Sequence, residues 1–194
     1  MNAPLSEQPA APAHAHAATG ALPGNPMMWL LIAAELMVFG GALVAYAGAR
    51  SLDPAGFVLA QDGLDRLAGA INTAVLLTSG LFAAFAVTAR EAGRRGLARA
   101  WLGAASLLGV VFLLVKAREY GAEFDAGHGL GDGGFFTLYF LITGFHAVHV
   151  VFGIVILAVV AVFDDIEHVE TGTAFWHMVD LVWVVIFPCL YLFR

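Results

Sequence analysis

Five ionisable residues interrupt long apolar stretches of this sequence: Glu35, His146, His149, His177 and Asp180. His146 and His149 are three residues apart, as are His177 and Asp180, so each pair projects from one face of a helix. Imidazoles and carboxylates can exchange protons or ligate a metal. Two interpretations stay open. In the first, these residues transfer protons or bind a metal. In the second, they form interhelical hydrogen bonds in which Asp180 orients an imidazole such as His149 or His177.

Glu35 lies in the first half of its apolar stretch. An ionised carboxylate at that depth in a membrane costs about 2.5–3.5 kcal/mol. We therefore expect Glu35 to face protein, to be protonated, or both. Either it exchanges protons or lines an aqueous or lipid cleft, or it is a neutral carboxyl group hydrogen-bonded between helices.

Small and polar residues share faces in the second apolar stretch. Asn72 and Ser79 are seven residues apart and project from the same side of a helix. Ala70, Ala74 and Thr78 form a ladder of small residues that lets another helix approach closely. The residues by themselves favour a packing role for both faces.

Lys116 and Glu119 end the third apolar stretch. Their spacing permits an ion pair at the membrane interface, with the lysine extending outward to the headgroups. Aromatic residues near the expected ends of the spans also predict an interfacial belt; they are Trp29, Tyr46, Trp101, Tyr120 and Tyr191.

The composition defines the elements that must position these side chains. Hydrophobic residues make up 60% and charged residues 12%, with a mean hydropathy of +0.83. Soluble domains carry about 25% charged residues, so the bilayer must be the solvent. Five stretches are long enough to span it: residues 27–50, 67–89, 98–115, 134–163 and 173–193. We predict an all-α integral membrane bundle of five transmembrane helices over residues 27–194, preceded by a disordered Ala/Pro-rich tail over residues 1–26.

Arginines predict the orientation of the bundle. The second connection carries Arg90, Arg94, Arg95 and Arg99 against Glu91. Loop arginines next to spans stay in the cytoplasm, which places the N-terminus in the cytoplasm and the C-terminus in the periplasm. The connection over residues 164–170 should share that side yet has no basic residue, but acidic residues count little in this rule.

Charge and cysteine content exclude other classes. The net charge of −6 and scattered basic residues argue against nucleic acid. The single cysteine, Cys189, excludes an intrachain disulfide and a cysteine zinc cluster. Outside the tail there are five histidines, of which we place His128 and His168 in loops. A haem-copper catalytic core needs more ligands than this arrangement supplies. We therefore expect no catalytic residue and no metal site in this chain.

The order of the motifs resembles subunit III of the haem-copper cytochrome c oxidase family over residues 27–194. The motifs are "WLLIAAEL", "INTAVLLTSG", "KAREY", "FFTLYFLITGFHAVHVVFG" and "HVETGTAFWHMVDLVW". The chain looks like the shorter form that lacks the first two of seven spans, as in quinol oxidases and in the related E-type accessory protein of bacterial nitric oxide reductases. Its short loops and the ending "FPCLYLFR" look closer to the nitric oxide reductase type.

The resemblance implies roles for particular positions. Glu35 matches the buried family glutamate that reacts with carbodiimides and borders a lipid-holding cleft between the first two of these spans and the remaining helices. Asn72 and Ser79 match the segment beside it. A second set matches polar family positions that form an interhelical network and bind neither haem nor copper: Lys116, Glu119, His146, His149, His168, Glu170, His177 and Asp180.

The resemblance implies a non-catalytic accessory subunit of a respiratory haem-copper oxidase or nitric oxide reductase in the bacterial inner membrane. It would support assembly, lipid binding and proton uptake beside subunit I and subunit II or a cytochrome c subunit. We expect bound phospholipid but no cofactor of its own, because haem and copper or iron reside in the partners. One alternative is an independent proton- or ion-coupled transporter using Glu35, His146, His149 and Asp180; another is a membrane metalloenzyme using the histidines within the spans.

Overall fold

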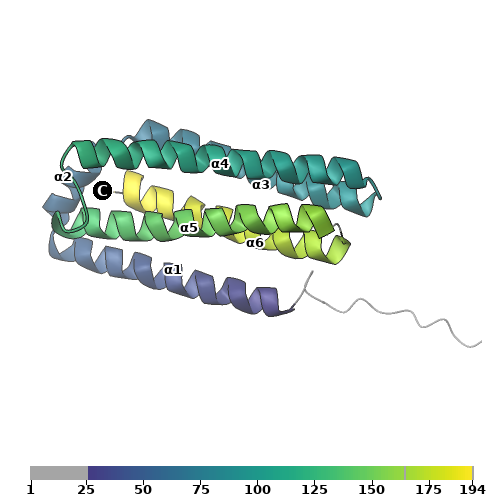
Figure 1. Ribbon diagram of the computed structural model, residues 1–194. Helices are drawn as coiled ribbons and strands as arrows, with labels where there is room; N and C mark the ends of the chain where they lie inside the picture. The colour runs from purple at the N-terminus through teal and green to yellow at the C-terminus, as the bar shows by residue number, and fades with distance from the viewer. Residues whose placement is uncertain (1–25, 164, 194) are drawn as a thin grey trace, which may run out of the picture.

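A computed structural model describes residues 26–163 and 165–193, and all the regular structure in these residues is helical. Five helices are long and apolar enough to cross a membrane, which confirms the predicted bundle (Figure 1). The elements are α1 (Pro26–Leu52), α2 (Pro54–Gly63), α3 (Arg66–Glu91), α4 (Arg95–Asp125), α5 (Gly133–Phe163), α6 (Ile166–Phe187) and the π-helical turn η1 (Pro188–Leu192). The predicted tail lies outside the described residues except for Pro26, and the orientation across the membrane stays a prediction.

The short helix α2 was not expected in the first connection. Asp53 caps its N-terminus, accepting a hydrogen bond from Gly56 N at 3.0 Å, and Pro54 occupies the first turn, where no N–H is needed. Gln61 on α2 is buried and donates to Tyr46 OH and Leu190 O, both at 3.0 Å. Through Gln61, α2 ties α1 to the C-terminal turn at the end of the bundle where it lies (Figure 1).

Helices α3 and α4 form a tight hairpin. Gly93 adopts φ +72° after α3, Arg94 N bonds to Ala89 O, and Gly93 N bonds to Arg90 O, both at 2.9 Å. This is a Schellman cap, which favours glycine because its backbone is left-handed. The buried residues of α4 then recur every three or four positions, as in a left-handed helix pair: Ala98, Leu102, Ala105, Gly109, Phe112, Lys116, Glu119 and Glu123.

Small residues on α3 face this hairpin partner, but not the ones expected. The buried face contains Gly69, Asn72, Leu76, Ser79, Gly80, Ala83, Ala86 and Ala89. The predicted ladder of Ala70, Ala74 and Thr78 is exposed on the bundle instead. The sequence carries two faces of small residues, and only the contacts with α4 and α6 decide which one is covered.

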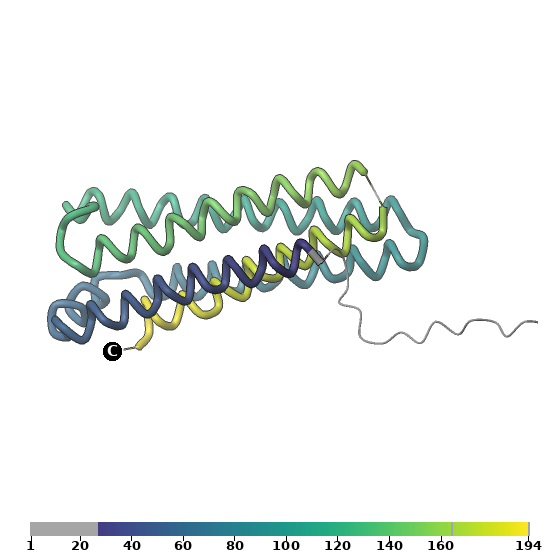
Figure 2. Tube along the Cα trace, turned by 90° about the horizontal axis from the view of Figure 1, so that it is seen from below, coloured from purple at the N-terminus to yellow at the C-terminus, as the bar shows by residue number. Residues whose placement is uncertain are grey.

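Helix α1 lies at the edge of the bundle. Its strongly buried hydrophobic residues are Ile32, Phe39 and Tyr46, a single stripe with a spacing of seven. Figure 2, seen from below, shows α1 nearest the viewer and in front of α6. Among the described residues α3 packs along α4 and α6, so α1 and α3 do not form a separate pair of helices. The lipid-holding cleft itself stays a prediction.

Two span boundaries also differ from expectation. Helix α4 runs to Asp125 rather than 115, since Lys116, Glu119 and Glu123 continue its buried face. Helix α6 begins at Ile166, so His168 lies in a helix rather than in a loop. After Pro188, which lacks an N–H, the backbone continues as a wide π-helical turn in which Phe193 N donates to Pro188 O at 2.9 Å.

Candidate functional site

Glu35 of α1 and His149 of α5 meet at the edge of the bundle. Glu35 Oε2 lies 2.9 Å from His149 Nε2, and the two side chains are 21% and 12% exposed. His149 Nδ1 lies 2.8 Å from Phe145 O. Because a carbonyl oxygen only accepts, Nδ1 carries a proton. The approach of Nε2 to Glu35 does not make a hydrogen bond, since Glu35 Oε2 is buried without a hydrogen-bond partner among the described residues, so the contact is a close approach of a carboxyl group and an imidazole.

The surroundings of this pair are apolar. The Phe39 and Phe145 rings contact the His149 ring edge-on, with centroids 5.3 and 4.5 Å away. A groove of about 300 Å³ between α1 and α5 is lined only by apolar residues, including both phenylalanines. A second groove of about 180 Å³ lies on the other side of Phe39, between α1 and α6. The Glu35–His149 pair thus stands beside open apolar grooves on both faces of α1.

His146 lies deeper than His149 and takes no part in that contact. It is fully buried, and neither ring nitrogen has a hydrogen-bond partner among the described residues. Its ring stacks on Trp183 at 5.1 Å and meets Phe112 edge-on at 5.6 Å. Of the four residues in the transporter alternative, the structure brings together only Glu35 and His149.

Lys116 and Glu119 form a closed cluster with two tyrosines. Lys116 Nζ lies 3.2 Å from Glu119 Oε2 and donates to Tyr139 OH at 3.0 Å and Tyr191 OH at 2.6 Å. Both phenols donate to Glu119 Oε1, Tyr139 at 2.6 Å. Lys116 is 2% exposed, so the predicted ion pair is confirmed and the predicted outward extension of the lysine is wrong. The phenols and the carboxylate satisfy the ammonium inside the protein.

Sequence reasoning missed Tyr139 and assigned Tyr191 to the interfacial belt, yet Tyr46 and Tyr191 are both buried. The available signal was the register of α4. Lys116 and Glu119 continue the spacing of Leu102 and Ala105, which indicates that they point inward. The partners on α5 and η1 had no such local signal.

Asn72 and Ser79 lie at the interface of α3 and α4, away from Glu35. Asn72 Nδ2 donates to Phe112 O at 3.2 Å, and Ser79 Oγ donates to Ala105 O at 2.7 Å. Trp176 Nε1 of α6 donates to Ser79 Oγ at 3.0 Å. These bonds join three helices. The predicted lipid-cleft role of Asn72 and Ser79 stays a prediction, and the structure does not place them beside Glu35.

The remaining predicted residues occupy separate positions. His177 Nδ1 lies 3.9 Å from Asp180 Oδ2, beyond hydrogen-bond distance. His168 Nδ1 lies 4.0 Å from Asp165 Oδ2, and both side chains are well exposed. Glu170 is half-buried. The expected polar set is thus several local contacts, and within residues 26–163 and 165–193 no three His, Cys, Asp or Glu side chains converge as metal ligands would.

Known proteins share this sequence pattern. The family profile described as Cytochrome c oxidase subunit III matches residues 11–194. Cytochrome c oxidase subunit 3 of Synechocystis sp. is 31% identical over 173 residues, covering 84% of this chain and 72% of that protein. The subunit 3 proteins of Prototheca wickerhamii and Pisaster ochraceus are 36% and 35% identical over 129 residues, or 62% of this chain and 48% of each of them.

The chain therefore spans about half the length of several curated relatives that it matches. The profile nevertheless covers all five spans and nearly the whole chain. On this evidence, the chain belongs to the cytochrome c oxidase subunit III family.

Proposed function

We propose that this chain is a non-catalytic subunit of a respiratory haem-copper oxidase in a bacterial inner membrane. The observation that supports this most is the family match over residues 11–194. Haem and copper chemistry would belong to the partner subunits, and this chain would contribute assembly, lipid binding and support of proton uptake. The relatives are named as cytochrome c oxidase proteins, which favours dioxygen over nitric oxide as the substrate of the whole complex.

The edge formed by α1 is our proposed place of action. Its two grooves are lined by apolar residues and have volumes of about 180 and 300 Å³, and α1 is the span with the smallest buried share. The Glu35–His149 contact places two groups that can bind a proton beside these grooves. We propose that phospholipid fills the grooves and that Glu35 and His149 shield one another from the acyl chains where α1 meets α5.

The test is gentle purification of the tagged chain from its native membranes. We expect haem-bearing and copper-bearing subunits to copurify, identified by mass spectrometry and by a haem absorption spectrum, with oxygen consumption by the purified complex. Copurification with a nitric oxide-consuming complex would replace the oxidase with the nitric oxide reductase type. A colourless, self-contained oligomer that moves protons in liposomes would overturn the proposal in favour of a transporter.

A further inference from the structure

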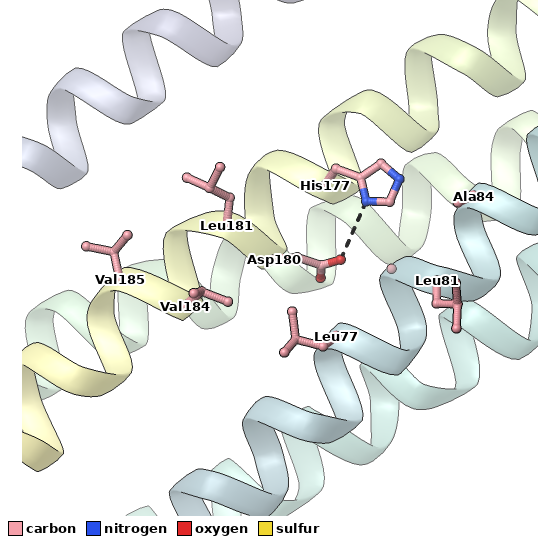
Figure 3. Close-up of a pocket in the computed structure, with 9 residues that line it drawn as sticks. Leu77, Leu81, Ala84, His177, Asp180, Leu181, Val184 and Val185 are labelled. Carbon is pink, nitrogen blue, oxygen red and sulfur yellow. Dashed lines mark ion pairs between the residues drawn. The ribbon is translucent and has the colours of Figure 1, made fainter.

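An open groove with two polar lining residues runs along the outer surface between α3 and α6. It has a volume of about 410 Å³ and is lined mainly by leucine, valine and alanine, with His177 and Asp180 as its polar residues (Figure 3). We call it the Asp180 groove. It differs from the grooves beside α1 because a nearly buried carboxyl group forms part of its wall.

The carboxyl group of Asp180 is poorly satisfied by the described residues. Its side chain is 8% exposed, Oδ1 is buried without a partner among the described residues, and Oδ2 is 3.9 Å from His177 Nδ1. The carboxyl group lies against α3 at Gly80, where an added Cβ would collide with Oδ2. Gly80 thus makes room for the Asp180 carboxyl group, which is buried without a hydrogen bond to Oδ1. A carboxyl group at membrane depth requires a hydrogen-bond partner.

The position of Asp180 along its span decides which molecules can form a hydrogen bond with it. Asp180 lies near the middle of the span Ile166–Leu192, and Gly80 lies near the middle of Arg66–Glu91. At 1.5 Å per residue, Asp180 is roughly 20 Å from either end of its span. Lipid headgroups begin about 15 Å from the midplane, and acyl chains carry no hydrogen-bond donor. Lipid alone therefore cannot satisfy the carboxyl group.

The outer face of α3 suits a helix. Ala70, Ala74, Leu77, Leu81 and Ala84 follow one another at intervals of four and three residues. All but Ala84, which is half-buried, are exposed, and this pattern matches the seam of a left-handed helix pair. The alanines at the N-terminal end of this stripe let the backbone of another helix approach α3 closely. The same stripe leads into the Asp180 groove, which Leu77, Leu81 and Ala84 line.

We propose that the Asp180 groove receives a transmembrane helix of a neighbouring subunit of the oxidase, with a hydrogen-bond donor side chain near its midpoint pointing at Asp180. A donor suits this position because a carboxyl group retains acceptor capacity whether or not it is ionised. The choice of partner rests on the proposed function. His177, about half exposed at the rim, offers a second polar contact to the same helix.

The first experiment maps what covers the groove in the intact complex. A photo-reactive benzoylphenylalanine replaces Leu77 in the groove or, as a control, Leu107 on α4, which is also exposed and lies outside the groove. We expect the Leu77 probe to label a transmembrane segment of another oxidase subunit that contains a donor side chain. Labelling of lipid alone, of a second copy of this chain, or of the same targets as the Leu107 probe would overturn the proposal.

The second experiment measures retention of the partner subunits during detergent purification, as haem per chain. From the usual energy of interhelical hydrogen bonds in membranes, we expect Asp180→Leu to weaken binding of the partner subunits roughly threefold to thirtyfold. Asp180→Asn should change it little. Leu81→Trp should block the groove and lower retention, whereas Leu107→Trp should not. If Asp180→Leu does not accumulate, Leu81→Trp decides the matter, because its side chain is at the surface.

The two proposals fail in different ways. A wild-type chain that purifies without any haem-bearing subunit overturns the proposed function and, with it, the partner named for the groove. An intact oxidase whose retention is unchanged by Leu81→Trp and Asp180→Leu overturns the groove proposal alone.

Discussion

The Lys116 cluster and the Glu35–His149 pair both place a carboxyl group and a nitrogen base within a membrane-spanning bundle, but their surroundings differ. Lys116 is 2% exposed and every polar atom around it has a partner from α4, α5 or η1. Glu35 is 21% exposed on its side chain, and its partner comes from one neighbouring helix beside two open grooves. In the first arrangement the ammonium is enclosed, although Glu119 also lines a cavity of about 360 Å³ between α3 and α4. The second arrangement borders apolar space that lipid can fill.

The residue types at the two sites are similar, so the packing around them decides whether other molecules can reach the polar groups. Around Lys116, aromatic rings of Tyr120, Tyr139 and Trp183 lie 4.7–5.3 Å from the ammonium and exclude other molecules. Along α1, Gly40 and Gly41 have no neighbour within 4 Å of an added Cβ. Changes in the first region should therefore affect stability, and changes in the second should affect lipid and turnover.

The largest expected effect is that of Lys116→Met. Removing the ammonium leaves Glu119 buried without its countercharge, which costs about 3–5 kcal/mol of unfolding free energy. Unfolding of the purified chain in mixed detergent micelles measures this. The control is Arg66→Met, which breaks an exposed pair with Asp62 and should cost at most about 1 kcal/mol.

A double variant sharpens this prediction. Lys116→Met combined with Glu119→Leu removes both charges, so it should recover much of the stability that the single change loses. If Lys116→Met alone cost less than the Arg66 control, the cluster would not stabilise the bundle and the comparison would fail.

The second prediction concerns Gly109, which packs against the Trp176 ring. An added Cβ at Gly109 would lie 2.7 Å from Trp176 Cη2, so Gly109→Ala should lower the free energy of unfolding by about 1–3 kcal/mol. Gly103→Ala on the same helix and Gly40→Ala on α1 meet no atom within 4 Å. Both should be neutral or stabilise by up to about 1 kcal/mol. Equal losses at Gly109 and Gly40 would show that α1 is packed as tightly as the core.

The third prediction concerns Ser79. Ser79→Ala removes one bond to Ala105 O and one from Trp176 Nε1, which should cost about 0.6–2 kcal/mol in the same unfolding measurement. Thr88→Ala is the matched control, because Thr88 is exposed and its hydroxyl donates to Ala84 O of its own helix. A loss no greater than that of Thr88→Ala would mean that Ser79 does not join the helices.

The smallest stability effect should come from Glu35→Gln. Glu35 Oε2 has no hydrogen-bond partner among the described residues, so an amide of the same size loses no bond there and the unfolding free energy should change by less than about 0.5 kcal/mol. Glu35→Ala should instead reduce phospholipid copurified with the complex and shorten sustained turnover, measured by lipid mass spectrometry and by oxygen consumption over time. Loss of assembly in Glu35→Gln would show that the contact with His149 needs an ionised carboxylate.

Much of the fold could be predicted because its signals are local. Apolar runs of span length define the five helices, and the spacing of Lys116 and Glu119 within one helix predicts their ion pair. The extent of α4 was missed, since charged residues were assigned to the membrane surface. Helix α2 was missed because Asp53 and Pro54 mark a helix start that was treated as part of a loop.

The sequence by itself determined the membrane class, the family pattern and the ionisable residues that interrupt the spans, because hydrophobicity and spacing along one helix are properties of short segments. Only the tertiary structure decided the partners. Lys116 meets Tyr191 seventy-five residues along the chain, Glu35 meets His149, and Asp180 meets a glycine rather than a donor. Such choices depend on which helix faces meet, and in a chain with apolar residues on every face that is set by how small and large side chains pack against one another.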